Sequence, residues 1–367
     1  MSTDARLGTL ELPHGRVQTP IFMPVGTQGS VKTLHPQDLE SLGAQIILGN
    51  TYHLSLRPGS GLIREMGGLH RFSSWNRPIL TDSGGFQVWS LAKLRKITEE
   101  GVRFQNHLDG AYMMLSPERS MEIQADLGSD IAMLFDECPP YPCDRKYAES
   151  SLGYTLRWAR RCKTWVQEHQ PCSGEGRQHH FGIVQGSVYA DLRKRCAEEL
   201  AAMDFDGYAI GGVSVGEPEE EMLRAIDHSV PWLPEDKPRY AMGLGTPPQL
   251  LEMIARGVDM FDCVMPTRNG RNGMLFTKDG IINMRNKKWE MDFSPIEVDG
   301  ASSVDTLYSK AYLRHLFHAQ ELLAMQIASI HNLAFYLWLA GEARKHIIAG
   351  DFSTWKPMMV KRLSTRL

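Results

Sequence analysis

The chain has 367 residues, of which 42% are hydrophobic and 23% charged, and its formal net charge is −3. This composition is that of a globular protein, and it excludes collagen, coiled-coil and disordered classes and a highly basic protein that coats nucleic acid non-specifically. Six cysteines without a CxxC pair predict a reduced chain with no disulfide framework. The first residues lack the apolar stretch of a signal peptide, and we expect a cytoplasmic protein.

Eight short apolar runs that end in Gly or a polar group are typical of parallel strands buried on both faces. Helical stretches separate many of them, for example Leu192–Met203 and Pro247–Arg256, the second with Thr246 as its N-cap. Eight such units predict an α/β fold, a (β/α)8 TIM barrel that forms a single domain over residues 1–367. A doubly wound sheet is the alternative, but it gives no reason for the count of eight. The runs are Pro20–Gly26, Gln45–Tyr52, Ile79–Gly84, Ile131–Glu137, His180–Gly186, Gly207–Gly212, Arg239–Gly245 and Met260–Pro266.

Two segments interrupt this repeat. Residues 102–115 carry Asp109-Gly110 between partly alternating flanks, which predicts a hairpin inserted after the third strand. Residues 274–325 follow the eighth strand and are expected to form an inserted subdomain. A long final helix is predicted from about Met325 to Ala349, with Gly350 as its stop. Gln326, His331 and Asn332 interrupt its apolar part, so we expect no transmembrane span.

Polar residues stand where the predicted strands end, which is where a TIM barrel builds its active site. One such Asp could simply cap the following helix, but several carboxylates that converge on one face are costly unless they bind something. Beyond the last strand, a Gly/Asn-rich loop begins a stretch, from Arg268 to Lys288, with six Lys/Arg and one acid, Asp279. This basic patch favours phosphate binding, and a solvated loop face is the alternative. The strand-end residues are Asn50, Asp82, Asp136, Gln185, Gly211, Gly212, Met242 and Asp262.

The motifs around these residues resemble those of the bacterial type of tRNA-guanine transglycosylase, over nearly the whole chain. The resemblance implies a TIM barrel that exchanges guanine 34 in the anticodon of GUN tRNAs for 7-aminomethyl-7-deazaguanine, a step in queuosine biosynthesis. It also implies a homodimer. The matching segments are MPVGTQGSVK (23–32), GNTYHLSLRPG (49–59), RPILTDSGGFQV (77–88), GSDIAMLFDECP (128–139), GIVQGS (182–187), GYAIGGVSVGE (207–217), DKPRYAMGLG (236–245) and GVDMFDCVMPTRNGRNG (257–273).

The resemblance assigns the chemistry to two carboxylates. Breaking a glycosidic bond with retention needs a carboxylate nucleophile and an oxocarbenium-like transition state. Asp262 matches the family's nucleophile, which forms a covalent ribosyl ester while guanine leaves. Asp82 matches the carboxylate that handles the proton at N9 of the base, and Asn50 matches the residue that holds it.

The remaining assignments concern recognition. Asp136 matches the carboxylate that accepts from the N1–H and 2-amino groups of guanine, a donor pair that adenine lacks. Gln185 and the Gly212 backbone N–H match the donors to O6. Phe86 and Met242 match the apolar faces that sandwich the base. Further expected substrate-binding residues are Val213, Cys138 and Glu217, and Arg268 and Arg271 match residues that contact the anticodon loop.

The chain departs from the family at a zinc site of the form C-x-C-x2-C followed by a distant His. Gly300, Ser302 and Asp305 replace the three cysteines, and only His331 is retained. A closed structural zinc site normally has four ligands in which thiolates dominate. We therefore predict that the chain binds no zinc and uses no cofactor.

Three other functions remain open at this point. The first is a non-catalytic tRNA-binding partner subunit, although the presence of Asp82, Asp136 and Asp262 argues against it. The second is a transglycosylase that acts on another nucleic acid. The third is a generic TIM-barrel glycosidase, which explains the acids but not the arginines that follow Asp262.

Overall fold

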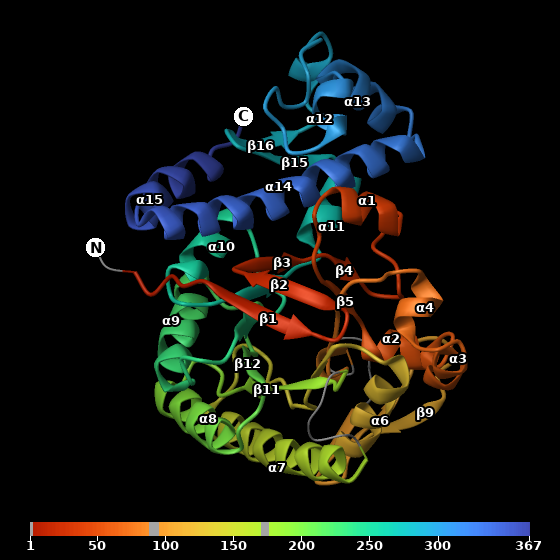
Figure 1. Ribbon diagram of the computed structural model, residues 1–367, viewed down its shortest axis with the longest axis vertical. Helices are drawn as coiled ribbons and strands as arrows, with labels where there is room; N and C mark the ends of the chain where they lie inside the picture. Colours follow the sequence, from red (N-terminus) through yellow and green to blue (C-terminus); the bar gives the residue numbers. More distant parts are fainter. Residues whose placement is uncertain (1–2, 88–94, 170–175) are drawn as a thin grey trace.

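The computed structural model describes residues 3–87, 95–169 and 176–367, and a parallel barrel lies at its centre (Figure 1). The strands of this barrel follow the order β3-β14-β13-β12-β11-β10-β6-β5-β4. β3 (Ile21–Met23) and β4 (Val25–Gly26), at the two ends of that order, are halves of one strand interrupted at Pro24, so the sheet closes around eight strand positions. The other barrel strands are β5 (Ile47–Gly49), β6 (Ile79–Thr81), β10 (Ile131–Met133), β11 (His179–Val184), β12 (Gly207–Ile210), β13 (Arg239–Ala241) and β14 (Met260–Asp262).

Each of the eight apolar runs in the sequence supplies one position of the barrel, and every neighbouring pair is parallel. The predicted TIM barrel is therefore confirmed, and the doubly wound alternative is wrong. The residues of these strands are buried almost throughout, as expected for strands covered on both faces.

Helices surround the barrel and connect its strands. The two helices predicted from their sequence patterns are present as α8 and α10, and Thr246 caps α10 in a capping box with Gln249. The helices through α11 are α1 (Pro36–Ser41), α2 (Thr51–Leu56), α3 (Ser60–Glu65), α4 (Leu69–Ser73), α6 (Pro117–Leu127), α7 (Arg145–His169), α8 (Ala190–Ala202), α9 (Glu219–Ser229), the 3-10 turn η1 (Val230–Trp232), α10 (Pro247–Ile254) and α11 (Met265–Arg271).

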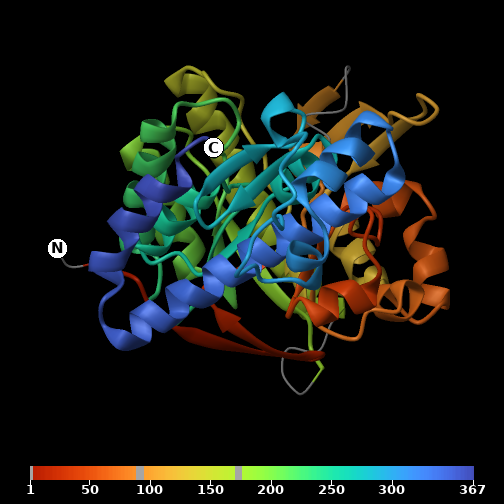
Figure 2. The same cartoon turned by 90° about the horizontal axis from the view of Figure 1, so that it is seen from above.

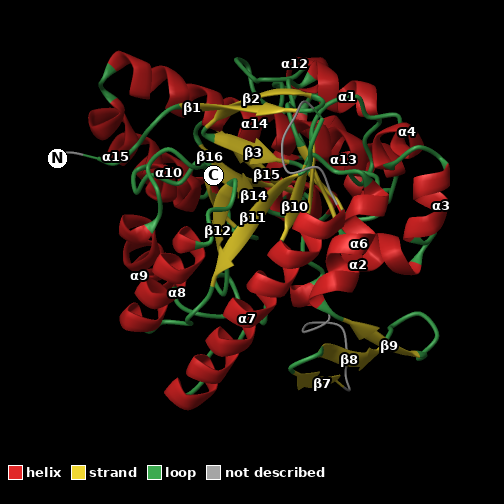
Figure 3. Ribbon diagram, turned by 60° about the horizontal axis from the view of Figure 1, so that its bottom comes forward, coloured by secondary structure: helices red, strands yellow, loops and turns green. Residues whose placement is uncertain are grey.

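A small antiparallel sheet projects beside the barrel, between β6 and α6 (Figure 3). It contains β7 (Arg95–Thr98), β8 (Gly101–Gln105) and β9 (Tyr112–Leu115). β8 and β9 pair with Val102 opposite Leu115, which is the span for which the sequence predicts a hairpin. The sequence prediction missed β7, whose alternation is short and largely polar.

A second hairpin closes the N-terminal end of the barrel. β1 (Gly8–Leu12) and β2 (Gly15–Thr19) pair antiparallel across this end. Val17 joins the buried cluster that fills the barrel interior, and Leu10 and Leu12 pack against it. This apolar plug shuts one end of the barrel, so polar chemistry is left to the opposite end.

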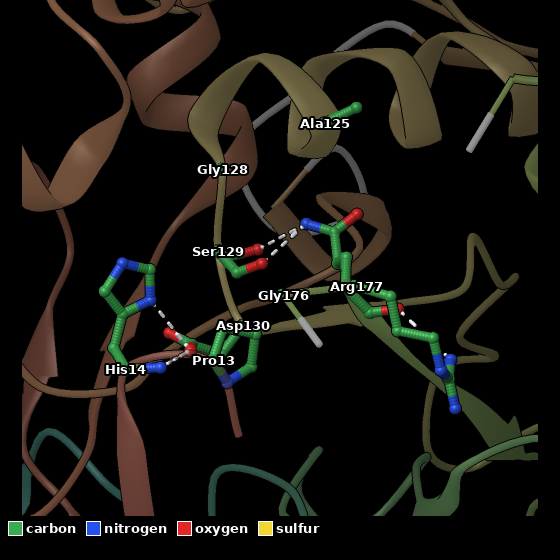
Figure 4. A pocket seen from close by; sticks show the side chains of 9 residues that line it. Pro13, His14, Ala125, Gly128, Ser129, Asp130, Gly176 and Arg177 are labelled. Atoms are coloured by element: carbon green, nitrogen blue, oxygen red, sulfur yellow. Dashed lines mark hydrogen bonds and ion pairs between the residues drawn. The ribbon is translucent and has the colours of Figure 1, made fainter. Parts of the chain in front are cut away.

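Asp130 anchors that hairpin to the barrel. Its carboxylate accepts hydrogen bonds from the His14 backbone N–H and ring Nδ1 (both 2.9 Å), the His70 ring (3.0 Å) and the Ile79 N–H (2.8 Å). Burial acts to raise the pKa of Asp130, but these donors outweigh it and lower the pKa. Figure 4 shows His14 and Asp130 at the edge of a pocket of about 250 Å³, and none of the predicted site residues lines it.

The C-terminal part of the chain packs along one side of the barrel (Figures 1 and 2). α14 (Leu322–Ala349) is buried against the barrel through Tyr336 and Leu339, and against a separate apolar cluster through Ala324 and Ile327. That separate cluster is built from residues that follow α11. The remaining elements are β15 (Met274–Thr277), β16 (Gly280–Asn283), the 3-10 turn η2 (Lys287–Trp289), α12 (Ser303–Leu307), α13 (Lys310–His318) and α15 (Phe352–Leu363).

α14 is long and apolar enough to cross a membrane, but 61% of its most apolar window is buried inside the fold. Its interrupting polar residues are satisfied by protein groups. Asn332 accepts from the Phe276 N–H and donates to the carbonyl oxygens of Pro266 and Met274 (all 2.9 Å). These contacts are typical of a core helix in a globular fold.

Replacing Asp130 tests the closure of the N-terminal end. Asp130→Asn removes the charge of a buried carboxylate and leaves some of its four donors without an acceptor, so we expect the free energy of unfolding to fall by about 2–4 kcal/mol. Urea unfolding at pH 7 measures this change. Asp204→Asn, at an exposed carboxylate whose ion pair in the described part of the chain is with Lys237, is the matched control. Equal stabilities of the two variants would contradict the anchoring role.

Candidate active site at the C-terminal end of the barrel

Three buried carboxylates lie at or just beyond the carboxyl ends of barrel strands. Asp82 follows β6, Asp136 lies beyond β10 and Asp262 ends β14. Their exposed fractions are 7%, 6% and 8%. The charges of Asp262 and Asp136 both raise the pKa of Asp82, so the three groups are near enough to interact. The predicted convergence at one end of the barrel is therefore present.

Asp262 is held by two neutral donors. Its Oδ1 accepts from the Tyr240 hydroxyl (2.6 Å) and from the Gly243 N–H (2.7 Å). Burial raises the pKa of Asp262, and these two hydrogen bonds oppose the rise. Burial and the charge of Asp262 hold the pKa of Tyr240 well above its ordinary value, so the phenol stays a donor at neutral pH. The hydrogen bonds fix one carboxylate oxygen, and among the described residues no hydrogen bond engages Oδ2, which is left for a reacting partner.

Asp82 is held by the first turn of α2. Its Oδ2 accepts from the Asn50 side chain (2.5 Å), and its Oδ1 accepts from the Thr51 N–H (2.9 Å). Asn50 also caps α2 by accepting from the His53 N–H (3.0 Å), which fixes the orientation of its amide. Burial raises the pKa of Asp82 to about 7. A carboxyl with this pKa can take up and release a proton at neutral pH.

Asp136 has acceptor capacity left for a ligand. It accepts from the Ser83 hydroxyl (2.8 Å) and from the Gln185 side-chain amide (2.7 Å). A carboxylate offers about four acceptor positions, so roughly two remain for a paired donor. Burial raises the pKa of Asp136 to about 6, which keeps it mostly ionised at neutral pH.

The loop after β12 lies against Gln185. Gly212 has a positive φ of 61°, and a Cβ there would come 2.5 Å from Gln185 Oε1, so only glycine lets the two approach. The Gly212 N–H lies beside the buried Cys138 sulfur, and burial raises the pKa of that thiol well above its ordinary value. Val213 is buried next to this loop. These predicted residues are therefore brought together.

The other residues predicted to bind the base differ in their contacts and in their exposure. Glu217 accepts from the Ser214 N–H and from the Val215 N–H (2.9 Å), so its carboxylate folds the loop after β12 back on itself. Met242 packs against the apolar cluster of the barrel interior. Phe86 is 42% exposed, as a ring that would face a ligand can be.

The predicted Gly/Asn-rich loop after β14 is wrong in one respect, because Met265–Arg271 forms α11. Gly270 and the asparagine of this segment disfavour a helix, but packing on α14 overrides that preference: a Cβ at Gly270 would come 2.8 Å from the Ala328 carbonyl oxygen. Arg268 and Arg271 lie in the last turn of α11. Arg271 Nη1 is buried and has no hydrogen-bond partner within the described part of the chain.

Sequence reasoning missed the residues that hold the carboxylates in place. Tyr240 and Gly243 hold Asp262, Thr51 holds Asp82, and Ser83 holds Asp136. All four are in the motifs that carry the resemblance. A hydroxyl or a glycine in a strand-end motif signals such a role only weakly, because either is common in turns.

Nearly the whole chain is similar in sequence to known proteins. A family model described as queuine tRNA-ribosyltransferase matches residues 2–365. A queuine tRNA-ribosyltransferase of Natranaerobius thermophilus is 52% identical over 357 residues, covering 97% of this chain and 95% of its own. Another from Pelotomaculum thermopropionicum is 54% identical over 349 residues, covering 95% and 92%. The chain belongs to the queuine tRNA-ribosyltransferase family. The resemblance drawn from its motifs is confirmed.

The segment that aligns with the zinc site of this family holds a hydrogen-bonded pair instead. Asp305 accepts from His331 Nδ1 (2.5 Å) and from the Ser302 N–H (2.7 Å), and His331 Nε2 contacts the Phe276 carbonyl oxygen (2.9 Å). Both ring nitrogens of His331 are thus engaged. A Cβ at Gly300 would come 2.2 Å from Asp305 Cβ, so Asp305 occupies the space of a side chain at Gly300.

These residues do not fit the family's thiolate site. Glu297, Asp305 and His331 place oxygen and nitrogen donor atoms within 4.8 Å of one another, but none of them is a sulfur. Burial acts to lower the pKa of His331, and the hydrogen bond and charge of Asp305 outweigh it, so the pKa is raised. To bind a metal through His331, one of its ring nitrogens would have to give up the hydrogen bond that it makes in this fold.

The raised pKa of Asp82 makes stability depend on pH. Because the folded-state pKa of Asp82 lies above its unfolded value, the unfolded chain releases this proton at lower pH than the folded chain does, and the fold loses stability as pH rises from about 4 to 7. Asp82→Asn removes this loss. We expect the stability of the variant relative to the unaltered chain to improve between pH 5 and pH 8 by on the order of 2 kcal/mol. Urea unfolding at both pH values measures it, and a pH-independent difference would contradict the raised pKa.

Proposed function

We propose that the chain is a tRNA-guanine transglycosylase, a pentosyltransferase of queuosine biosynthesis. It exchanges guanine 34 in the anticodon of GUN tRNAs for 7-aminomethyl-7-deazaguanine. The observation that carries the proposal is the set of three buried carboxylates at the open end of the barrel, each held by different donors. The printed names of relatives that cover nearly the whole chain support it.

In this proposal Asp262 attacks C1′ of the ribose through its free oxygen. Tyr240 and Gly243 fix the other oxygen, so the nucleophile is aimed before the substrate binds. The C1′–N9 bond breaks as the Asp262–C1′ bond forms, and Asp82 supplies the proton to N9 of guanine. The incoming base then gives its N9 proton to Asp82 and displaces Asp262 from C1′. The tRNA backbone remains intact throughout.

Asp136 reads the base. Its two remaining acceptor positions fit the N1–H and 2-amino groups of guanine, which adenine does not offer as a pair. Gln185 Nε2 carries two hydrogens, so it can donate to Asp136 and to O6 of the base at once. Phe86 and Met242 would enclose the faces of the ring, with Cys138 and Val213 behind it.

The partner is tRNA, held by α11 and the basic segment that follows it. Arg268 and Arg271 stand in the last turn of the helix that follows the strand of the proposed nucleophile, and within the described residues Arg271 Nη1 is a buried donor without a partner. Arginine suits phosphate oxygens because its planar donors bind two oxygens together. In this proposal the anticodon loop lies beside Asp262.

We infer that the chain works as a cytoplasmic homodimer. The segment 274–325, which we treat as an inserted subdomain, carries several strongly exposed apolar side chains, and a second copy of the chain would cover them. They are Met291, Phe293, Val298, Leu307 and Leu322.

Asp262→Asn tests the reaction. It removes the nucleophile while keeping its size, so incorporation of labelled guanine into an unmodified tRNA transcript with a GUN anticodon should fall about a thousandfold or more. A covalent protein–RNA band on a denaturing gel should also disappear. Asp204→Asn, at an exposed partner of Lys237, should keep both signals.

Activity retained by Asp262→Asn would assign the nucleophile to another residue. No exchange by the unaltered, folded chain would favour the non-catalytic tRNA-binding subunit or another nucleic-acid substrate.

We also propose that the Asp305–His331 pair takes the structural place of zinc and that the chain carries no metal cofactor. Elemental analysis of the purified protein should then find far less than one zinc per chain, and a chelator should leave the melting temperature unchanged. Near-stoichiometric zinc, or unfolding by the chelator, would contradict this proposal.

A further inference from the structure

One buried cation lies behind the base site and takes no part in the roles assigned so far. Arg193 stands in the first turn of α8, which follows the loop that carries Gln185. Its exposed fraction is 0%. Burying a charged guanidinium costs desolvation free energy, and in most proteins a buried guanidinium is paired with a carboxylate.

The hydrogen bonds of Arg193 instead go to backbone carbonyl oxygens within the described part of the chain. Nε donates to the Ser187 oxygen (2.6 Å). Nη1 and Nη2 both donate to the Gly211 oxygen (3.1 Å each), and Nη2 also reaches the Gly212 oxygen (3.3 Å). Burial lowers the pKa of Arg193 to about 10, which still leaves it protonated at neutral pH.

The Gly211 carbonyl and the Gly212 N–H belong to one peptide group. Two cationic donors on a carbonyl oxygen draw electron density through the planar peptide and strengthen its N–H as a donor. They also fix the orientation of the peptide plane. The Gly212 N–H is directed toward the Cys138 sulfur, and the Cα of Gly212 packs against Gln185, on the side of the loop assigned to O6 of the base.

The reaction places negative charge at that position. When the C1′–N9 bond breaks, its electron pair stays with the purine, where conjugation spreads it onto O6 until Asp82 protonates N9. A fixed donor aimed at an atom that gains charge stabilises the transition state more than the ground state.

We propose that Arg193 is a positioning residue for the exchange, which orients and polarises the Gly211–Gly212 peptide toward the purine O6. This inference rests on the proposed function, and it adds a cation that acts through a peptide group. A purely structural role for Arg193, which only ties two loops together, makes a different prediction.

The positioning role and the purely structural role of Arg193 predict different results when the acceptor at position 6 of the purine is changed. 6-Thioguanine keeps the N1–H, 2-amino and N9 groups of guanine but offers a weaker acceptor. The measurement is kcat/KM for incorporation of guanine and of 6-thioguanine into the tRNA transcript, for the unaltered chain and for Arg193→Met. Arg195→Met, at an exposed arginine of the same helix that pairs with Glu199, is the matched control.

We expect Arg193→Met to lower kcat/KM for guanine about ten- to a hundredfold, and for 6-thioguanine much less. The preference for guanine should therefore shrink by about tenfold. Arg193→Lys, which keeps the charge but not the fork of donors, should give an intermediate preference, and it carries the test if Arg193→Met does not fold. Arg195→Met should leave both values unchanged.

Equal losses for both bases would overturn the proposal and leave Arg193 with a structural role. The proposal would also be contradicted if folded, active Arg193→Lys and Arg193→Met both kept the preference of the unaltered chain for guanine over 6-thioguanine. Absence of guanine exchange by the unaltered chain is a separate result, because it removes the proposed function itself.

Discussion

The burial of three carboxylates at the one polar end of a closed barrel is the constraint on which the rest of the site depends. The hairpin β1–β2 and its apolar plug shut the other end, so Asp82, Asp136 and Asp262 share a region with little water. Within the described residues, the hydrogen bonds to these carboxylates come from hydroxyl, amide and backbone N–H groups. Neutral donors orient a carboxylate without lowering its pKa as far as an arginine would.

Because the three aspartates have different donors and neighbours, they differ in pKa and in the oxygen that is free to react. Asp82, which interacts with both other carboxylates, has a pKa of about 7, whereas Asp136 has a pKa of about 6 and Asp262 keeps one oxygen fixed by Tyr240 and Gly243. A base exchange runs the same proton transfer in both directions. A group with a pKa near the working pH gives up a proton to the leaving base and recovers it from the incoming base with little bias.

The sequence was sufficient for the barrel because each strand is a short apolar run buried on both faces, and its end is marked by a polar group. It was insufficient where packing decides the structure. The segment Met265–Arg271 contains a glycine and an asparagine and has weak helix propensity, yet packing against α14 holds it as a helix. The strand-end acids were evident from the pattern, but their supports, such as Tyr240 and Ser83, reach them from the neighbouring strand of the barrel. Register and side-chain direction, which determine such contacts, are not readable from one strand alone.

Buried polar groups also find partners within the protein at the segment that aligns with the family's zinc site and at Arg193. Asp305 and His331 form a buried pair of opposite polarity, so the segment satisfies its polar groups without thiolates. Arg193 is a buried cation whose hydrogen bonds go to peptide carbonyls, with the charge of Glu217 near enough to favour its protonated form, and we propose that it polarises the peptide at the edge of the base site. Glycosyl transfer separates charge, because the ribose becomes oxocarbenium-like while the purine becomes anionic. In the proposed reaction, carboxylates lie on the ribose side and a cation lies behind O6, so the buried charges complement this separation. We infer that these charges are buried because they stabilise the transition state rather than the resting fold.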